Sequence, residues 1–388
     1  MVEQLHRTGG VVFRGSGSAT PQRSISNTEL GQRVETSDDW IRSRTGIAAR
    51  RVIGADESLG ELNGLAAERA LSMAGWSADS LDLILLATST PDDLFGSAPR
   101  LQARIGAVNA AAFDLTAACS GFLFAVVTAA QYLRSGAMQR ILVVGADQLS
   151  RWVDWDDRRS CVLFGDAAGA VVMEASDEQD DLQGFLLRSD GGRGAVLQLP
   201  QSSERAPLVG DASPQRGGFE PIQMNGQEVY KFAVREVPAI LEALLQKTET
   251  QADSLDWLLL HQANQRILDA VAERFSIPNE KVLSNLAHYG NTSAATIPLM
   301  LDEAVRDGRI QPGHRIASSG FGAGLSWGAA QLRWSGPASS PRTSVRTRHG
   351  DRLGFSRPGL TEAGHGGSGA QPQRRQPTLR HGLRAAGP

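Results

Sequence analysis

The sequence contains little cysteine, no long apolar run and no leader-like start. Its two cysteines, Cys119 and Cys161, are too few for a disulfide framework in a chain of 388 residues, which favours a reducing, cytoplasmic location. The first residues, MVEQLHRTGGVVF, lack the apolar core of a signal peptide. The longest apolar stretch, 121–130, is well short of the ~20 residues that a membrane-spanning helix needs. We therefore expect no membrane partner.

Positive charge is scarce over most of the chain. Nine of the 39 Lys and Arg residues, but only two of the 42 Asp and Glu residues, lie between Pro337 and the end. Residues 1–336 therefore carry 30 basic and 40 acidic side chains. Such an acidic body argues against a general nucleic-acid-binding protein. Segment 337–388 is rich in Arg, Pro and Gly and lacks apolar periodicity, so we expect a disordered tail.

The rest of the chain alternates short apolar runs with helix-like stretches. Residues 81–89, 111–115 and 140–147 are predicted to be buried strands. Residues 120–136 are predicted to form a helix that ends near Gly136. Apolar strands that alternate with helices indicate an α/β protein whose sheets are covered by helices on both faces.

The sequence also contains an internal repeat. ADSLDLILLATST (78–90) resembles ADSLDWLLLHQAN (252–264), and FGDAAGAVVME (164–174) resembles SWGAAQLRW (326–334). Two similarities in the same order favour a duplicated α/β unit. We predict two similar halves, residues 1–176 and 177–336, followed by the tail at 337–388.

Cys119 is placed where a nucleophile would be useful. In AAFDLTAACSGFLFAVV, it lies between a predicted strand and a predicted helix, among small residues that leave room for a substrate carbonyl. Free N–H groups and the helix dipole favour an anion at a helix N-terminus. We therefore predict a thiol with a lowered pKa. Cys161 lies within an apolar run and is predicted to be an inert core residue.

The second half supplies two polar residues at positions where α/β proteins collect their sites. His261 directly follows a predicted buried strand, and Asn291 lies in a loop before a helix-like stretch. Cys, His and Asn together could act as nucleophile, proton-handling group and amide donor to an oxyanion. A purely structural role for His261 stays open at this point.

Several motifs together resemble the β-ketoacyl-acyl carrier protein synthase III family. The similarity extends from about Gly9 to Trp334. Its motifs are ETSDDWIRSRTGI (35–47), AFDLTAACSGF (112–122), FGDAAGAVV (164–172), NGQEVYKFAV (225–234), HQANQRI (261–267), HYGNTSAATIP (288–298), LDEAVRDGRIQPG (301–313) and FGAGLSWGAA (321–330). The resemblance implies the thiolase fold with two similar α/β halves, and a homodimer.

The resemblance also implies a reaction. Cys119 would take an acetyl group from acetyl-CoA, and malonyl-acyl carrier protein would then lose carbon dioxide and condense with it. The backbone N–H groups of Cys119 and of Gly322 or Ala323 would stabilise the acyl-transfer oxyanion. His261 and Asn291 would stabilise the enolate. No metal or redox cofactor is implied.

The same resemblance implies binding residues. Trp40 and Arg158 would stack on the adenine of CoA, and Arg44 would lie near its phosphates. Phe95 would limit the acyl pocket. The remaining predicted residues contact the pantetheine arm (Gly226 and Asn264) or the acidic carrier protein (Gln262, Ala263, Asn264, Gln265, Arg266, Lys231 and Arg274).

Two other functions remain possible on the sequence. A type III polyketide synthase also uses Cys, His and Asn, although HQANQRI and YGNTSAA fit the fatty-acid enzyme better. A non-catalytic thiolase-fold protein could bind acyl-CoA or carrier protein, but the intact Cys, His and Asn set argues against it. A thiolase would need a second cysteine near GFGAG, which has none.

Overall fold

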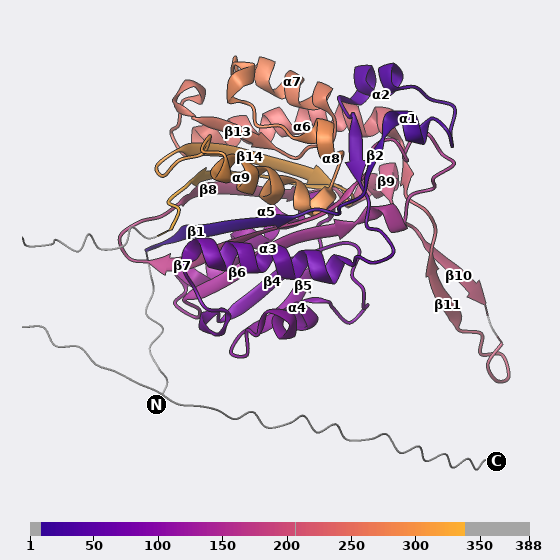
Figure 1. Ribbon diagram of the computed structural model, residues 1–388, viewed down its shortest axis with the longest axis horizontal. Coiled ribbons are helices and arrows are strands. Elements are labelled where there is room, and N and C mark those ends of the chain that lie inside the picture. The colour runs from indigo at the N-terminus through magenta and orange to yellow at the C-terminus, as the bar shows by residue number, and fades with distance from the viewer. Residues whose placement is uncertain (1–8, 206, 338–388) are drawn as a thin grey trace, which may run out of the picture. The chain divides into compact units, whose positions relative to one another are not determined.

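Two β-sheets form the framework of the protein (Figure 1). The computed structural model describes residues 9–205 and 207–337. The predicted tail lies outside the described residues from 338 onward. The first sheet has the strand order β1-β7-β6-β4-β5, and the second has the order β13-β14-β15-β8.

Each sheet combines parallel strands with antiparallel neighbours. In the first sheet, β4 is parallel to β5 and β6, and β7 is antiparallel to β6 and β1. In the second, β13 is parallel to β14, and β15 is antiparallel to β14 and β8. The strands are β1 (Gly10–Ala19), β4 (Leu83–Ala87), β5 (Ala111–Leu115), β6 (Arg140–Gln148), β7 (Asp166–Ser176), β8 (Leu182–Ser189), β13 (Trp257–Leu260), β14 (Arg315–Gly322) and β15 (Ser326–Arg333).

Helices form three layers around these sheets (Figure 1). Helices α5 (Gly121–Arg134) and α9 (Thr296–Arg306) lie between the two sheets. Helices α3 (Leu59–Ala74) and α4 (Ala98–Ile105) cover the first sheet, while α6 (Gly226–Lys247) and α7 (Gln265–Arg274) cover the second. Inner strands such as β4 and β6 are therefore buried on two faces, which explains why they contain continuous apolar runs.

The predicted elements correspond closely to the observed ones. Strand β5 has the predicted bounds, β4 and β6 lie within or one residue beyond their predicted ranges, and α5 spans 121–134 of the predicted 120–136. The last strand of the first sheet ends at Ser176, and the first strand of the second sheet begins at Leu182. The domain boundary near 176 stays a prediction.

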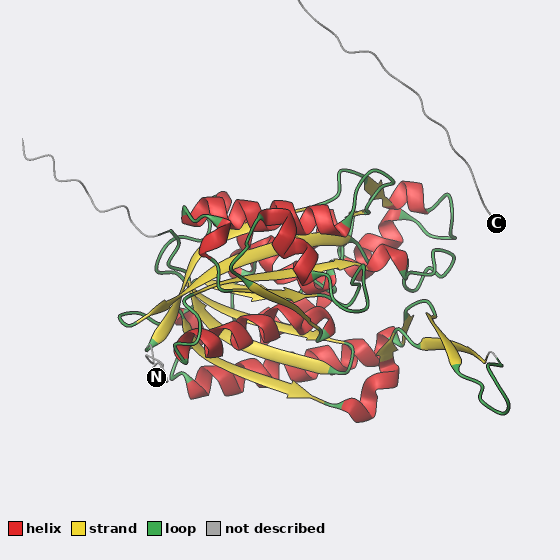
Figure 2. Ribbon diagram, turned by 90° about the horizontal axis from the view of Figure 1, so that it is seen from below, coloured by secondary structure: helices red, strands yellow, loops and turns green. Residues whose placement is uncertain are grey.

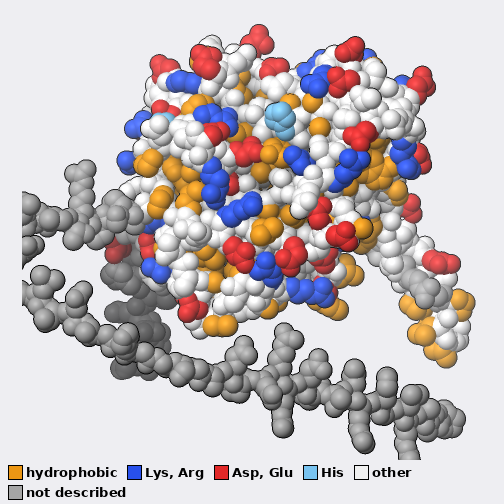
Figure 3. All heavy atoms as spheres, in the orientation of Figure 1, with side chains coloured by type: hydrophobic (Ala, Val, Ile, Leu, Met, Phe, Trp, Pro, Cys, Tyr) orange, Lys and Arg blue, Asp and Glu red, His pale blue; other side chains and the backbone are white. Residues whose placement is uncertain are grey.

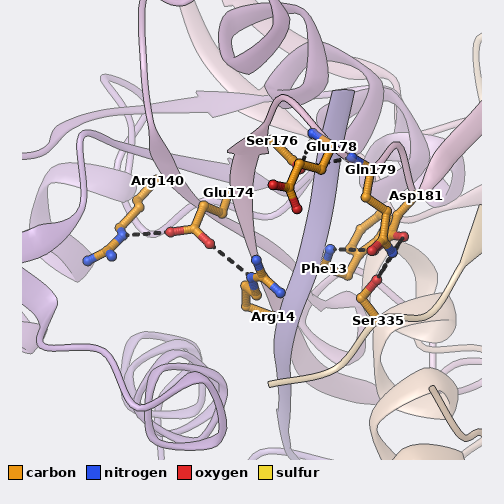
Figure 4. Close-up of polar contacts among 9 residues, drawn as sticks. All are labelled: Phe13, Arg14, Arg140, Glu174, Ser176, Glu178, Gln179, Asp181 and Ser335. Carbon is orange, nitrogen blue, oxygen red and sulfur yellow. Dashed lines mark hydrogen bonds and ion pairs between the residues drawn. The ribbon is translucent and has the colours of Figure 1, made fainter. Parts of the chain in front are cut away.

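The connection between the sheets is held by a buried carboxylate (Figure 4). Asp181 accepts hydrogen bonds from the Phe13 N–H of β1 at 2.9 Å and from Ser335 Oγ at 2.8 Å. Nearby, Glu174 of β7 pairs with Arg14 and Arg140 on the neighbouring strands. Residues from the start, middle and end of the described chain therefore meet at one place.

The smaller elements surround the framework. A hairpin of β10 (Gln201–Arg205) and β11 (Gln215–Phe219) projects from the body (Figure 2), and its tip carries hydrophobic side chains (Figure 3), including the exposed Leu208 and Val209. Among the described residues, no helix is long and apolar enough to cross a membrane. The remaining strands and helices are β2 (Ser24–Ser26), β3 (Ala49–Arg51), β9 (Leu197–Gln198), β12 (Gln223–Met224), α1 (Asn27–Leu30), α2 (Asp38–Thr45) and α8 (Leu286–Tyr289).

Candidate active site

Cys119 lies in a tight turn between strand and helix, as predicted. Strand β5 ends at Leu115, the 3-10 turn η2 spans Ala118–Ser120, and α5 begins at Gly121. Ala118 has a φ of 47°, a conformation that costs a non-glycine residue roughly 1–3 kcal/mol. Such strained backbone is common at functional sites, where the surrounding structure over-determines it. The turn places the thiol at the start of the central helix.

The Cys119 thiol is buried, and its pKa is raised rather than lowered. Burial raises this pKa to about 12. A hydrogen bond from Ser293 Oγ to Sγ, 3.3 Å long, acts to lower it, while the nearby Asp147 carboxylate raises it. The predicted lowering is therefore wrong, because a thiolate here loses the hydration that stabilises it in water. The thiol is therefore protonated near pH 7.

The end of β14 and the loop after it lie directly against Cys119. A Cβ atom on Gly322 would come within 2.6 Å of the Cys119 backbone nitrogen, so glycine permits this approach. Ala323, the next residue, lines the same cavity as Cys119. The structure thus places both candidate loop residues beside Cys119, where the predicted oxyanion site would be.

His261 lies at the end of β13, as predicted, and is buried. Its N–H donates to Ser319 O at 2.8 Å, and its ring stands edge-on to Phe321 with 5.3 Å between ring centroids. Burial lowers the pKa of this imidazole to about 3, so the ring is neutral near pH 7. Its Nδ1 atom is buried and has no hydrogen-bonding partner among the described residues. A neutral imidazole still provides one N–H donor.

Asn291 is held by its backbone and by one side of its amide. Its N–H donates to Leu163 O at 2.8 Å, and its carbonyl accepts from Gly165 N–H at 3.0 Å. Its Oδ1 accepts the Ser293 N–H at 2.9 Å. Because Oδ1 is engaged, the amide group is oriented, and its NH₂ remains as the donor.

Two cavities meet at Cys119. The smaller, of about 180 Å³, is lined by Cys119, His261 and Asn291 together. The larger, of about 600 Å³, is lined mainly by apolar residues, among them Leu94, Phe113 and Phe219. The three predicted catalytic residues, which lie far apart in sequence, therefore face one space.

The predicted CoA-binding residues lie together at the surface. The guanidinium of Arg44 lies 5.0 Å from the ring centroid of Trp40, and that of Arg158 lies 5.4 Å from it. Arg158 also donates to Glu35 O at 2.9 Å. The partly exposed indole with two flanking cations offers a surface on which an aromatic base could stack.

Gly226 and Asn264 both line the smaller cavity, as the pantetheine assignment requires. Asn264 also has a structural role. Its Oδ1 caps α7 by accepting the Arg266 N–H at 2.9 Å, and its Nδ2 donates to Arg44 O at 3.0 Å. One side chain thus links the cavity wall to the Trp40 surface.

The predicted carrier-protein contacts include exposed residues, but some of these already form ion pairs with acidic side chains. Arg266 is exposed and lies over the ring of Tyr230, 5.4 Å from its centroid. Lys231 and Arg274 are exposed but pair with Glu228 and Glu242. Ala263 and Gln265 are partly exposed. The positive patch is therefore partly neutralised by its own neighbours.

Gln262 does not fit the predicted docking role. It is 1% exposed, and its Nε2 donates to Leu260 O and Leu283 O. Its amide links the end of β13 to the segment at Leu283, because a buried amide must satisfy its donors inside the fold. A partner protein cannot reach this side chain.

Phe95 does not close the acyl pocket of its own chain. Its side chain is fully exposed, and Leu94 beside it is 84% exposed, although both lie at the rim of the larger cavity. Strand β5, which carries Phe113, is one of the two edge strands of the first sheet, and its outer side pairs with no strand among the described residues. The expected pocket wall is therefore absent from the described single chain.

Three further residues belong to the site and were not predicted. Ser293 contacts Sγ, and Asp147 is buried beside it at the end of β6. Arg159 lines the smaller cavity and pairs with Asp157. Asp147 had a usable signal, since it is a charged residue at the end of the apolar run RILVVGAD.

Among residues 9–205 and 207–337, no group of three or more His, Cys, Asp or Glu side chains is arranged to hold a metal ion. The absence of a cofactor stays a prediction.

Comparison with known proteins identifies the family. Residues 113–191 match the 3-oxoacyl-[acyl-carrier-protein] synthase III family, and residues 245–334 match its C-terminal family. A β-ketoacyl-[acyl-carrier-protein] synthase III from Prochlorococcus marinus (strain MIT 9313) is 74% identical over 329 residues, 84% of this chain and 97% of that protein. "3-Oxoacyl" and "β-ketoacyl" are two names for one group.

Solved structures agree with this result. The 3-oxoacyl-[acyl-carrier-protein] synthase III from Aquifex aeolicus VF5 is 39% identical, with a TM-score of 0.77 over 84% of this chain and all of that one. The priming β-ketosynthase of the R1128 polyketide pathway is 33% identical, with a TM-score of 0.78 over 87% of this chain and 99% of that one. The predicted thiolase fold is confirmed, and the chain belongs to the β-ketoacyl-acyl carrier protein synthase III family.

Proposed function

We propose that this chain condenses acetyl-CoA with malonyl-acyl carrier protein to give acetoacetyl-acyl carrier protein, carbon dioxide and CoA, the first condensation of fatty acid synthesis. The observation that carries the proposal is the single cavity lined by Cys119, His261 and Asn291. Each supplies a different chemical group to one space, and a pure binding protein has no need of a strained nucleophile turn.

In the first half-reaction, Cys119 Sγ attacks the acetyl thioester, and CoA leaves. The negative oxygen of the tetrahedral intermediate would accept hydrogen bonds from the backbone N–H groups of Cys119 and Ala323. Gly322 supports this arrangement because it allows the loop to approach the Cys119 nitrogen. Removing one such donor typically costs ~10²–10³ in rate.

In the second half-reaction, malonyl-acyl carrier protein loses carbon dioxide, and its enolate attacks the acetyl group. His261 and Asn291 would donate to the enolate oxygen. The low pKa of His261, about 3, supports a neutral donor, since a neutral imidazole stabilises the oxygen without first having to be protonated. Asn291 is already oriented by the bond to its Oδ1.

We also propose that two copies of the chain associate along β5. Supporting this are the unpaired edge of β5 and the exposed apolar residues around it: Leu94, Phe95, Val108 and Phe113. Exposed sheet edges and large apolar patches are usually covered by a partner. A second copy would also supply the missing wall of the larger cavity. A cytoplasmic location fits the two free, buried cysteines.

The test is acylation followed by condensation. Intact-mass measurement after incubation with acetyl-CoA should show one acetyl adduct, and malonyl-acyl carrier protein should then discharge it as the acetoacetyl product. A protein that only binds acyl-CoA would show no adduct. Formation of longer products from malonyl-CoA, without a carrier protein, would instead support the polyketide synthase alternative.

A further inference from the structure

The Cys119 sulfur has one side-chain hydrogen-bonding partner among the described residues. Ser293 Oγ lies 3.3 Å from Sγ, and both residues are buried. His261 makes no comparable bond to the sulfur. Because the thiol is protonated in the free protein, it needs a route for its proton, and that route begins at the group in contact with it.

Behind Ser293 lies a buried carboxylate. Asp147 is 0% exposed at the end of β6, and its pKa reflects a hydrogen bond with the Ser293 hydroxyl. Its Oδ2 accepts the Ala294 N–H at 3.2 Å, and its Oδ1 accepts the Ser89 N–H at 2.7 Å. The hydroxyls of Thr88 and Thr90 also bond to Oδ1. Ser293 therefore stands between the sulfur and the carboxylate. Its single hydroxyl proton can turn from Sγ to Asp147, which leaves Ser293 Oγ free to accept the thiol proton.

No cation balances this carboxylate within the described part of the chain. Asp147 forms no ion pair there, and the titratable groups that face it are Cys119 from η2 and Asp166 from β7. A purely structural acceptor of backbone N–H groups does not need a charge, and an unpaired buried charge is costly. Burial raises the pKa of Asp147, which makes its carboxylate a better proton acceptor.

The backbone fixes the position of Ser293, which lies between Cys119 and Asp147. Ser293 has a φ of 52°, and a Cβ atom on Gly145 of β6 would come within 2.3 Å of Ala294 O. Turn η7 (Ser293–Ala295) is therefore pressed against β6, which carries Asp147. This close approach holds the Ser293 hydroxyl between the two acidic groups.

We propose that Ser293 and Asp147 form a proton relay for Cys119. As Sγ bonds to the acetyl carbon, its proton passes to Ser293 Oγ, and the Ser293 proton passes to an oxygen of Asp147. CoA leaves as a thiolate and takes a proton from water. In the condensation, the Cys119–acetyl bond breaks, and Asp147 returns its proton through Ser293 to the departing sulfur. This relay rests on the acyl-transfer function proposed above. Within the relay, Ser293 contacts the reacting sulfur and is a catalytic residue, and Asp147 acts through Ser293.

The test compares the rate of acetyl-enzyme formation, by rapid quench and intact mass, in Ser293→Ala, Asp147→Asn and the double variant. General acid–base groups contribute 10²–10⁴ in rate, so each single variant should be slowed about 10²-fold. The double variant should be no slower than Ser293→Ala, because both substitutions break one path. Thr292→Val is the matched control, since it removes a neighbouring buried hydroxyl that bonds to Thr296 and not to the sulfur.

Two further measurements separate a relay from a structural role. Ser293→Ala should slow acylation much more than it slows carbon dioxide release from malonyl-acyl carrier protein, because only acylation uses the thiol proton. In the pH range where the acylation rate of wild type is constant, the acylation rate of the variants should rise with pH. In the variants, hydroxide must take the thiol proton in place of the relay. Equal losses of acylation and decarboxylation, or wild-type acylation in Ser293→Ala, would overturn the relay.

Alkylation by iodoacetamide distinguishes this proposal from the proposed function. It needs the thiolate but neither substrate, so it reports on the relay even if acetyl-CoA proves not to be the acyl donor. At pH 7, Ser293→Ala should react about 10-fold more slowly than wild type, because it removes the hydrogen bond that lowers the pKa of the Cys119 thiol. Unchanged alkylation in folded Ser293→Ala would reject the relay, while a wild-type protein that is alkylated but never acetylated would reject the function.

Discussion

The turn that carries Cys119 and the turn that carries Ser293 occupy matching places in the two halves. Each is a 3-10 turn that begins with a non-glycine residue at positive φ, 47° for Ala118 and 52° for Ser293. Each leads directly into a central helix, α5 or α9. The two turns pack against one another between the sheets.

What differs between the two turns is the chemistry they carry. The first places a thiol at its second residue, while the second is preceded by the amide of Asn291 and begins with the hydroxyl of Ser293. The same strained backbone thus presents a thiol from one half and an amide and a hydroxyl from the other. The comparison teaches that the two halves share the geometry of this turn, while a few residues give each turn different chemical groups.

The repeated pentapeptide shows the same preservation of local structure. ADSLD forms a 3-10 turn in each half, Ala78–Ser80 and Ala252–Ser254, followed by a parallel strand. In each half, the final Asp donates its N–H to the first residue of a neighbouring strand, Arg140 or Arg315, at 2.9 or 3.0 Å. The halves diverge only after the strand, where Thr88-Ser89-Thr90 supports Asp147 and His261 enters the cavity.

The largest expected effect falls on the first turn. Cys119→Ala should abolish the acetyl adduct in intact-mass measurements, because no other described nucleophile occupies that position. It should still release carbon dioxide from malonyl-acyl carrier protein, since the enolate donors come from the other half. An acetyl adduct on the variant would show that Cys119 is not the nucleophile.

The corresponding change in the second half should separate the two half-reactions. Asn291→Ala should still form acetyl-enzyme but lose condensation by ~10²-fold or more, the usual scale for one lost donor. Because Asn291 also accepts the Ser293 N–H, the melting temperature serves as the control for folding. Normal carbon dioxide release combined with failed acetylation would reverse the assigned roles.

His261 should make the stability of the protein sensitive to acid. Its folded pKa is about 3 against an ordinary 6.5, so the unfolded chain binds a proton below pH 6.5 that the folded protein refuses. Stability from this group is complete above pH 6.5 and is lost as the pH falls toward 3. Between pH 7 and 5, wild type should lose about 2 kcal/mol more than His261→Ala in urea unfolding. Equal losses would contradict a buried, neutral imidazole.

A smaller effect should follow at the rim of the larger cavity. If a second copy closes that cavity, Phe95→Ala removes part of its wall, and kcat/KM for isobutyryl-CoA relative to acetyl-CoA should rise about 10-fold. The matched control is Leu208→Ala, another exposed apolar side chain that lies on the hairpin tip. An unchanged ratio in a dimeric Phe95→Ala protein would remove Phe95 from the pocket.

The smallest expected effect compares the two pentapeptides directly. Ser80 Oγ donates to Ser77 O, and Ser254 Oγ donates to Gln251 O, each at 2.7 Å. Replacing either serine with alanine should cost about 0.5 kcal/mol in chemical unfolding, since both bonds are exposed and local. A difference of more than about 1 kcal/mol between the two would show that the halves do not hold these turns alike.

Sequence by itself determined the elements, the duplication and the position of Cys119 between strand and helix. Those features depend on apolar periodicity and on neighbours a few residues away, and the bounds of β5 show how closely such local signals are followed. Sequence motifs likewise predicted the site residues Cys119, His261 and Asn291. The tertiary structure alone decided the raised pKa of Cys119, the burial of Gln262 and the exposure of Phe95. It also decided the contact between Cys119 and Ser293, which lie 174 positions apart. Burial, hydration and hydrogen-bonding partners are set by segments distant in sequence, and no local pattern records them.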